Sequence, residues 1–317
     1  EGGNAHWVAE RGHGRASGRN DRADPPARRG SGIVRAAVLG SPIAHSLSPV
    51  LHNAGYAALG LGEWEYGRFE LVADDLPGFL ARLDDEWRGL SLTMPLKEAC
   101  LDVADEATPV ARRARAANTL VRRPDGGWLA DNTDVPGLVD ALLPAWQPSW
   151  QHVAVLGSGA TARSALLALP TLGVTSVDVY ARNLAKAATL EEWAPSGLEL
   201  AVLPLEQWTS DDQLVVLSTL PGGAADGFTL PGPRTGLLFD VVYAGWPTPL
   251  ARTARSAGMT VVGGLDLLVH QAARQFALFT GLEAPVEAMF AAGRAVLDPP
   301  AGSAPRSQGP SGSGGNP

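Results

Sequence analysis

Two kinds of hydrophobic pattern alternate along the chain: short continuous apolar runs and apolar stripes with helical spacing. Ordered structure is expected to begin at the apolar run 33–40, which ends in a glycine. Ser48-Pro49 is typical of a helix start, and apolar residues continue at helical spacing to Leu61. The first half is further predicted to contain strands at 65–71, 90–93, 117–121 and 128–130, and helices at 76–83, 97–103 and after Pro136.

A second pattern begins at His152, where strands and helices follow each other regularly. Continuous apolar strands that alternate with helices indicate a doubly wound parallel sheet, so the predicted fold class is α/β. The predicted strands are 152–156, 176–180, 214–217, 236–242 and 260–262, and the predicted helices are 160–169, 184–193, 265–280 and 282–296.

The composition fits a globular protein with unstructured ends. The 317 residues are 45% hydrophobic and 18% charged, which is enough for two domains with cores of their own. Residues 1–32 and 298–317 have almost no apolar periodicity, so we expect a disordered extension and a disordered tail. Since the chain does not begin with Met, residue 1 is not expected to be a native start.

The charge and the cysteine content exclude several classes of function. Residues 33–298 carry a net charge of −11, against −8 for the whole chain, which argues against nucleic-acid or anionic-membrane partners. Cys100 is the only cysteine, so no disulfide framework, thiolate site or metal is expected. No apolar run reaches about 18 residues and no signal peptide is recognisable, so a cytoplasmic location is expected.

Lys97 is a candidate for proton transfer. Pro95 suits the first position of a helix and would place Lys97 in the first turn. The helix dipole disfavours a cation there by up to about 1 kcal/mol, which makes the release of a proton easier. A lone lysine is more often a solvated surface charge. The catalytic interpretation therefore depends on partners from elsewhere in the chain.

The segment Gly157-Ser158-Gly159-Ala160-Thr161-Ala162 follows a predicted strand and opens a predicted helix. This is the pattern of a dinucleotide site, in which Gly157 allows the turn, Gly159 lets a pyrophosphate approach, and Ala162 keeps helix and strand close. The anion would rest on the helix N-terminus. The alternative is a tight turn that binds no ligand.

The end of the following strand distinguishes the two nicotinamide cofactors. An NAD site normally has a carboxylate about 20 residues after the glycines. Here Arg182 and Lys186 occupy that region and could pair with a 2′-phosphate, whereas Asp178 lies inside the strand and is interpreted as structural. NADP is therefore the predicted cofactor. Ordinary surface charge is the alternative for both cations.

Six motifs occur in order within residues 33–297: Gly40–Pro49 (GSPIAHSLSP), Thr93–Glu98 (TMPLKE), Ala117–Leu120 (ANTL), Asp131–Asp134 (DNTD), Gly157–Ala162 (GSGATA) and Leu268–Ala273 (LVHQAA). With these motifs, residues 33–297 resemble the shikimate dehydrogenase family.

The resemblance implies a role for each matching position. Lys97 and Asp134 would be the catalytic pair, and the hydroxyls of Ser46 and Ser48 would bind the substrate carboxylate, although Ser48 is also a candidate N-cap. The ring hydroxyls would be held by Thr93, Asn118 and Gln271. Tyr243 would lie near substrate and nicotinamide, or else be a core aromatic residue, and Gly264 would join the cofactor site.

The implied reaction interconverts 3-dehydroshikimate and shikimate. NADPH would deliver hydride to the ring carbonyl carbon while Lys97 donates the proton and Asp134 holds the lysine. The resemblance also implies that residues 33–133 with 265–297 form a substrate domain and 134–264 a dinucleotide domain of the Rossmann type, with the active site in the cleft between them.

Several positions depart from the family pattern. Ser91 stands where the family often has Asn, and Ala181-Arg182-Asn183 replaces the usual Asn-Arg-Thr. The segments 218–221 and 264–266 also differ. An NAD-preferring quinate/shikimate dehydrogenase and a non-catalytic shikimate-binding paralogue remain as alternatives. The oligomeric state, a homodimer included, stays open.

Overall fold

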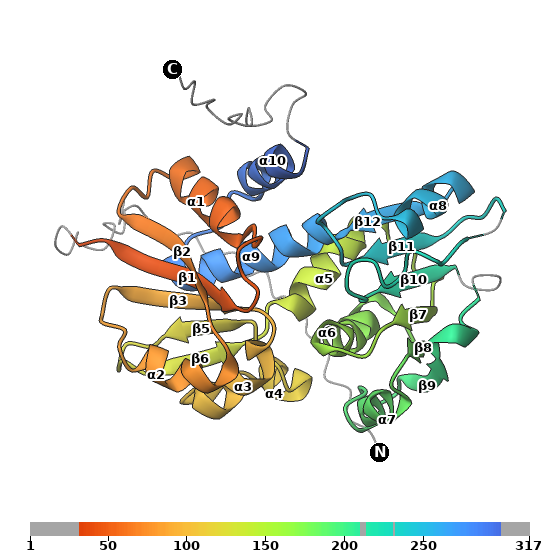
Figure 1. The fold of residues 1–317 in the computed structure, drawn as a ribbon, viewed down its shortest axis with the longest axis horizontal. Coiled ribbons are helices and arrows are strands. Elements are labelled where there is room, and N and C mark those ends of the chain that lie inside the picture. Colours follow the sequence, from red (N-terminus) through yellow and green to blue (C-terminus); the bar gives the residue numbers. More distant parts are fainter. Residues whose placement is uncertain (1–31, 210–213, 231, 299–317) are drawn as a thin grey trace, which may run out of the picture. The chain divides into compact units, whose positions relative to one another are not determined.

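The computed structural model describes residues 32–209, 214–230 and 232–298. The described residues from Ile33 to Asp298 belong to one compact unit, which contains two six-stranded sheets with helices packed on them (Figure 1). The α/β fold class is confirmed. The expected disordered segments lie outside the described residues, apart from Gly32 and Asp298. No helix in the described part of the chain is long and apolar enough to cross a membrane.

The first sheet is mixed, with the strand order β2-β1-β3-β5-β6-β4. Its first three strands run parallel, and β5 and β6 form an antiparallel hairpin around Gly126, whose φ is +89°. The strands are β1 (Val34–Gly40), β2 (Trp64–Glu70), β3 (Trp87–Leu92), β4 (Glu106–Ala107), β5 (Thr119–Arg122) and β6 (Trp128–Asp131).

Successive residues of β1 point to opposite faces of this sheet, as a strand requires. Ala37 and Leu39 pack under α2 and α3, whereas Ala36 and Val38 pack under α1 and α9. The helices associated with this sheet are α1 (Ser48–Ala58), α2 (Leu76–Leu80), α3 (Leu96–Val103), α4 (Pro109–Ala114), α9 (Gly264–Thr280) and α10 (Val286–Leu297).

The second sheet is entirely parallel, with the order β12-β11-β10-β7-β8-β9. This is the doubly wound order, in which the direction of winding reverses between β7 and β10, and ligands bind at that switch point. The strands are β7 (His152–Leu156), β8 (Ser176–Ala181), β9 (Glu199–Pro204), β10 (Val215–Ser218), β11 (Leu237–Asp240) and β12 (Thr260–Gly263). Its helices are α5 (Asp134–Leu142), α6 (Ala160–Ala168), α7 (Leu184–Ala188) and α8 (Pro249–Ala257).

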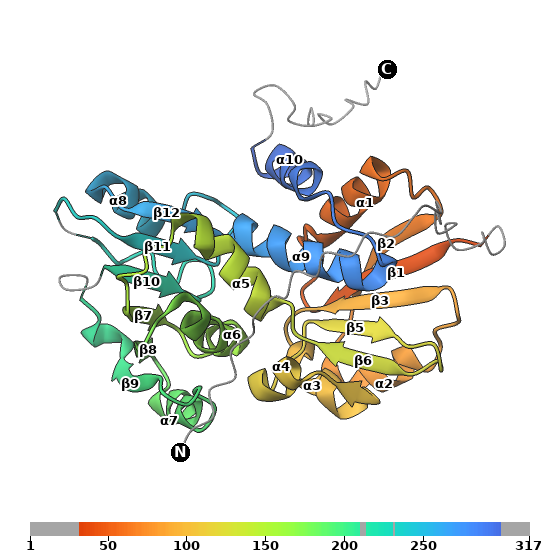
Figure 2. The same ribbon diagram turned by 180° about the vertical axis from the view of Figure 1, so that it is seen from behind.

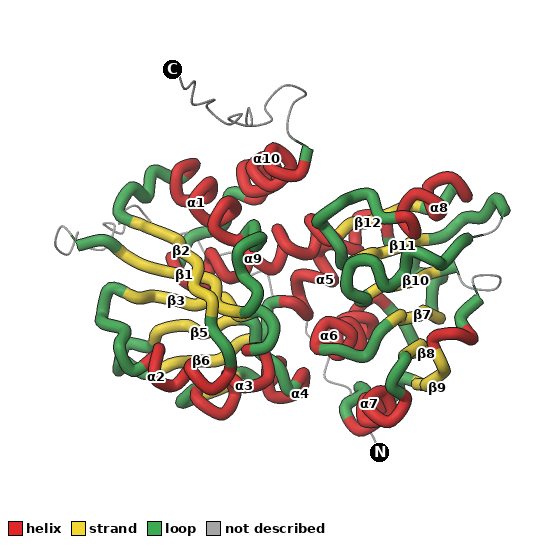
Figure 3. The backbone as a smooth tube through the Cα atoms, in the orientation of Figure 1, coloured by secondary structure: helices red, strands yellow, loops and turns green. Residues whose placement is uncertain are grey.

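Helices α5 and α9 pack against each other and run between the two sheets (Figures 1 and 2). The contact is close because a Cβ on Gly137 would lie 2.8 Å from the backbone nitrogen of Gln271. Figure 3 shows how α9 returns the chain to the first sheet after the last strand of the second. This return brings residues far apart in the sequence to one place.

Two predicted helix starts are wrong in detail. Pro95 precedes α3 instead of opening it, because the helix begins at Leu96. Ser48 is the first residue of α1, and no side chain caps that helix. The predicted helix 184–193 is also divided, since α7 ends at Ala188 and a 3₁₀ turn follows over Thr189–Glu192.

Four elements were not predicted: α4, α8, β4 and β9. Both missed helices begin with Thr-Pro, and the hydroxyls of Thr108 and Thr248 accept hydrogen bonds from the backbone N–H groups of Ala111 and Ala251. An N-cap threonine followed by proline is a recognisable helix signal. The strands were missed because β4 has only two residues and β9 is half-exposed at an edge of its sheet.

Candidate active site

A cavity of about 310 Å³ lies beside α9 and is lined from both sheets. Every residue predicted to bind substrate or to catalyse lines it, and so do two of the predicted cofactor residues. The ten are Ser46, Ser48, Thr93, Lys97, Asn118, Asp134, Tyr243 and Gln271, with Thr161 and Gly264.

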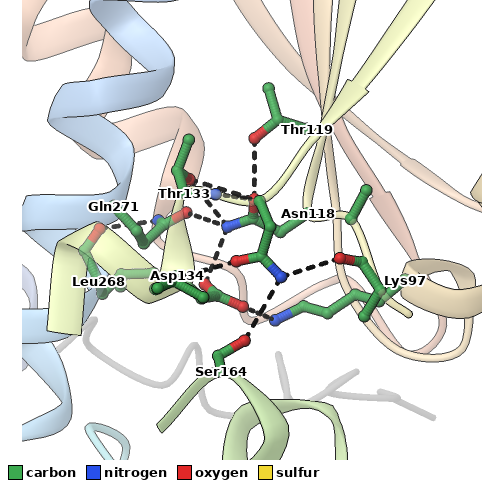
Figure 4. Close-up of polar contacts among 12 residues, drawn as sticks. Lys97, Asn118, Thr119, Thr133, Asp134, Ser164, Leu268 and Gln271 are labelled. Atoms are coloured by element: carbon green, nitrogen blue, oxygen red, sulfur yellow. Dashed lines mark hydrogen bonds and ion pairs between the residues drawn. The ribbon is translucent and has the colours of Figure 1, made fainter. Parts of the chain in front are cut away.

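Lys97 and Asp134 form an ion pair at this cavity, with Nζ 2.6 Å from Oδ2 (Figure 4). Lys97 comes from the first turn of α3 and Asp134 from the first residue of α5. The side chains are 19% and 8% exposed, so water screens the pair only partly. An ammonium group has three hydrogens, of which Asp134 accepts one. The pair can therefore hold a proton donor against a ligand in the cavity.

Asn118 is the centre of the polar network around this pair (Figure 4). Its Nδ2 lies 2.8 Å from Asp134 Oδ1, 2.9 Å from Thr133 Oγ1 and 3.1 Å from Gln271 Oε1. Its Oδ1 accepts from the backbone N–H of Thr133 at 2.8 Å. Both oxygens of Asp134 thus accept a hydrogen bond, one from Asn118 and one from Lys97. The carboxylate is fixed in orientation.

The rest of the Asp131–Asp134 motif is structural. Asp131 accepts from the hydroxyl of Thr108 at 2.7 Å, and Asn132 donates to the carbonyl of Ala116 at 2.8 Å. These bonds hold the segment that leads from β6 into α5. They place Asp134 at the cavity.

Ser46 and Ser48 lie at the N-terminal end of α1. The Ser46 hydroxyl accepts from the backbone N–H of Ser48 at 3.3 Å. Neither hydroxyl donates to another described residue, and Ser48 does not cap its helix. Both hydroxyls can therefore donate to an anion.

The dinucleotide segment has the geometry that the motif predicts. Gly157 follows β7 with φ +110°, and a Cβ there would lie 2.5 Å from Thr219 Oγ1. A Cβ on Gly159 would meet no atom within 4 Å, so the backbone at this point is open to a ligand. Ala162 is fully buried in the core under the sheet. The loop can take a pyrophosphate at the N-terminus of α6.

Arg182 and Lys186 follow the end of β8 and are both exposed. Asp178 lies 3.1 Å from His152 Nε2 on the neighbouring strand, in keeping with its predicted structural role. No carboxylate occupies Ala181-Arg182-Asn183, and Asn183 caps α7 through the N–H of Lys186. The cations are thus available to a phosphate at the edge of the loop.

Burial raises the pKa of the Tyr243 phenol, so this side chain stays protonated at neutral pH. It lines the cavity after β11, which argues against a purely core position. No group of three or more His, Cys, Asp or Glu side chains that could hold a metal occurs in the described ranges.

Three polar residues at the cavity were not predicted to belong to the site: Ser91, Gln275 and His45, which lies in the Gly40–Pro49 motif. Ser91 was noted only as a departure from the family pattern, and Gln275 was missed. Gln275 lies one helical turn after Gln271 on α9, and side chains four residues apart share a helix face. That spacing was the signal in the sequence.

Two family models match this chain. The shikimate dehydrogenase substrate binding domain matches residues 38–120, and the shikimate 5'-dehydrogenase C-terminal domain matches residues 264–292. The first match contains Ser46, Lys97 and Asn118, and the second contains Gly264 and Gln271.

Curated relatives and solved structures agree with these matches. The chain is 38% identical over 267 residues to the NADP(+) shikimate dehydrogenase of Caulobacter vibrioides, with 80% of this chain and 91% of the relative covered. It is 35% identical over 273 residues to that of Synechococcus sp., with 82% and 93% covered.

The structure of Mycobacterium tuberculosis shikimate dehydrogenase is similar, with a TM-score of 0.75, 45% identity, and 83% of this chain and 99% of that chain covered. Shikimate 5-dehydrogenase of Thermus thermophilus, solved with NADP(H) and shikimate, has a TM-score of 0.73 and 34% identity, with 83% and 99% covered. The chain belongs to the shikimate dehydrogenase family.

Proposed function

We propose that this chain catalyses the reversible, NADP-dependent reduction of 3-dehydroshikimate to shikimate. The observation that carries the proposal is the Lys97–Asp134 pair at a cavity lined by every predicted substrate-binding residue. The family membership and the relative solved with NADP(H) and shikimate support it.

The composition of the basic residues supports the role of Lys97. The chain has 25 Lys and Arg residues, and only Lys97 and Lys186 are lysines. An arginine cannot release a proton at neutral pH, whereas a lysine can. Of the two lysines, Lys97 lines the cavity. We infer that it donates the proton to the carbonyl oxygen of the substrate as that oxygen gains negative charge.

The other cavity residues bind and orient the substrate in this proposal. The hydroxyls of Ser46 and Ser48 donate to the carboxylate, a task for which neither is committed elsewhere. Asn118 and Gln271 bind ring hydroxyls together with Thr93, because amide and hydroxyl groups can both donate and accept. A site built to hydrogen-bond several hydroxyls discriminates strongly against analogues that lack one.

The loop Gly157–Ala162 holds the pyrophosphate of the cofactor, and Arg182 and Lys186 pair with its 2′-phosphate. The open space at Gly159 and the exposed cations after β8 fit this group. When bound, NADPH supplies the hydride. Gly264 and Tyr243 line the cavity from the side of the second sheet and would border the nicotinamide.

We propose two functional domains around this site, 33–133 with 265–297 for the substrate and 134–264 for the cofactor. Asp134 stands at the first boundary and Gly264 at the second, where α5 and α9 begin. Both helices thus carry site residues at or near the crossings between the domains.

The first test is a spectrophotometric assay at 340 nm with shikimate and quinate, each against NADP and NAD. The proposal expects the highest kcat/KM with shikimate and NADP. A preference for quinate with NAD would favour the quinate/shikimate alternative. Shikimate binding without turnover on any of the four pairs would show a non-catalytic paralogue.

Lys97→Arg tests the proton-transfer role directly. Arginine keeps the charge and can pair with Asp134 but cannot give up a proton, so kcat should fall about 10²- to 10⁴-fold. Lys186→Arg is the matched comparison, because holding a phosphate needs a cation but no proton transfer, and it should change mainly the KM for NADP. Near wild-type kcat in Lys97→Arg would exclude Lys97 as the proton donor.

A further inference from the structure

A buried chain of hydrogen bonds reaches the cavity through Ser91 and Gln275. It begins at Tyr66 on β2, whose OH lies 2.5 Å from Ser91 Oγ on β3, and continues from Ser91 Oγ to Gln275 Oε1 at 2.7 Å. The three residues are 4%, 3% and 1% exposed. Because water does not reach them, each group depends on these partners for its hydrogen bonds.

The donors and acceptors along these hydrogen bonds can be assigned in one direction only. Gln275 Nε2 lies 2.9 Å from the carbonyl oxygen of Asn118 and 2.9 Å from Thr119 Oγ1. A carbonyl only accepts, so the NH₂ of Gln275 must face it, and Gln275 Oε1 must accept from Ser91. Ser91 in turn accepts from Tyr66. Burial raises the pKa of the Tyr66 phenol, which keeps it a donor.

The same order of donors and acceptors continues to the side chain of Asn118. Thr119 Oγ1 accepts from Gln275, so its own hydrogen is left for Asn118 Oδ1 at 2.9 Å. The N–H of Thr133 donates to the same oxygen. With Oδ1 held by these donors, the NH₂ of Asn118 must face Asp134 and Gln271 (Figure 4).

We propose that Gln275, together with Ser91 and Tyr66, acts as a positioning residue that fixes the amide of Asn118. One N–H then stays on Asp134, and the other, which faces Gln271 at the cavity, can pass to a substrate hydroxyl. The proposal rests on the proposed function. Ser91 lines the cavity, but its hydrogen is committed to Gln275, so it is not a donor to the substrate. This distinguishes it from Ser46 and Ser48 in the same cavity.

Two substitutions each remove one hydrogen-bonding group from this network, at neighbouring positions along the path to Asn118. Gln275→Met removes the amide with little change in volume, and Thr119→Val removes only the hydroxyl. Each should lower kcat/KM for shikimate about 10-fold with the KM for NADP unchanged. Since both break the path to Asn118, the double variant should lose at most about twofold more than the worse single variant. Multiplicative losses, or an equal loss of NADP binding, would overturn the proposal and indicate general structural damage.

A matched pair of tyrosines gives a milder test. Tyr66 and Tyr56 are both buried in the core under α1 and α9, but the Tyr56 hydroxyl has no partner among the described residues. Tyr66→Phe should lower kcat/KM for shikimate about threefold or more, and Tyr56→Phe should leave it unchanged. Equal effects in the two variants would refute the proposal.

The activity of the wild-type protein distinguishes a failure of this proposal from a failure of the proposed function. If it shows no turnover of shikimate with NADP, the proposed function fails and this inference fails with it. If the wild type is active and Gln275→Met, Thr119→Val and Tyr66→Phe all match it, only the positioning role is refuted.

Discussion

We predict that burial of His52 makes the stability of this protein sensitive to mild acid. It lies on α1, is fully buried, and stacks on Tyr66 with ring centroids 4.1 Å apart. Neither ring nitrogen has a hydrogen-bond partner among the described residues. The groups that can titrate around it are the phenols of Tyr56 and Tyr66, whose pKa values burial raises, so they stay neutral in acid. No neighbouring charge compensates for protonation of the imidazole.

Burial lowers the pKa of His52 from 6.5 to about 3. Below pH 6.5 the unfolded chain therefore takes up a proton that the folded chain does not, and the free energy of unfolding falls as the pH falls. Each pH unit in this window costs about 1.4 kcal/mol. Between pH 7 and pH 5 the loss from His52 is about 2 kcal/mol, and above pH 7 it vanishes.

The measurement is urea unfolding followed by tryptophan fluorescence at several pH values from 8 to 5, for the wild type and His52→Leu. Leucine suits this apolar position, and it cannot be protonated. Other groups, including His270, titrate in both proteins and cancel in the comparison. The wild type should lose about 2 kcal/mol more than the variant between pH 7 and pH 5. Parallel pH profiles would refute the reasoning.

Two further predictions concern the cofactor site. Arg182→Ala should raise the KM for NADP about 10-fold or more and leave the KM for NAD nearly unchanged, because only NADP carries the 2′-phosphate; steady-state kinetics with both cofactors measures this, and a parallel change would contradict the assignment. Gly264→Ala would place a Cβ 2.0 Å from the backbone oxygen of Val241, so the free energy of unfolding should fall by more than about 2 kcal/mol. An unchanged urea midpoint would contradict this prediction and show that the backbone shifts to accommodate the added methyl group.

The sequence by itself determined the fold class and predicted the residues of the site. Continuous apolar strands that alternate with helices predicted the parallel sheet. The Gly157–Ala162 segment between a strand and a helix predicted the phosphate loop, since few other residues permit that turn. The ordered motifs named Lys97, Asp134 and their partners, all of which line one cavity. Local patterns sufficed for these predictions because each motif combines residues that a particular turn or helix start requires with side chains of a particular chemistry.

Only the tertiary structure decided which side chains contact and hydrogen-bond one another at the site. Ser48 was a candidate N-cap from its neighbours alone, but the start of α1 leaves its hydroxyl available at the cavity. The approach of α5 to α9 at Gly137 brings Asp134 beside Asn118 and Gln271, which are 153 positions apart. Gln275 lies four residues after Gln271, yet its importance depends on a hydrogen-bond path through β2, β3 and β5. Hydrogen bonds between distant segments depend on which segments pack together. The periodic apolar pattern shows that a face is buried, but it does not show which segment covers that face.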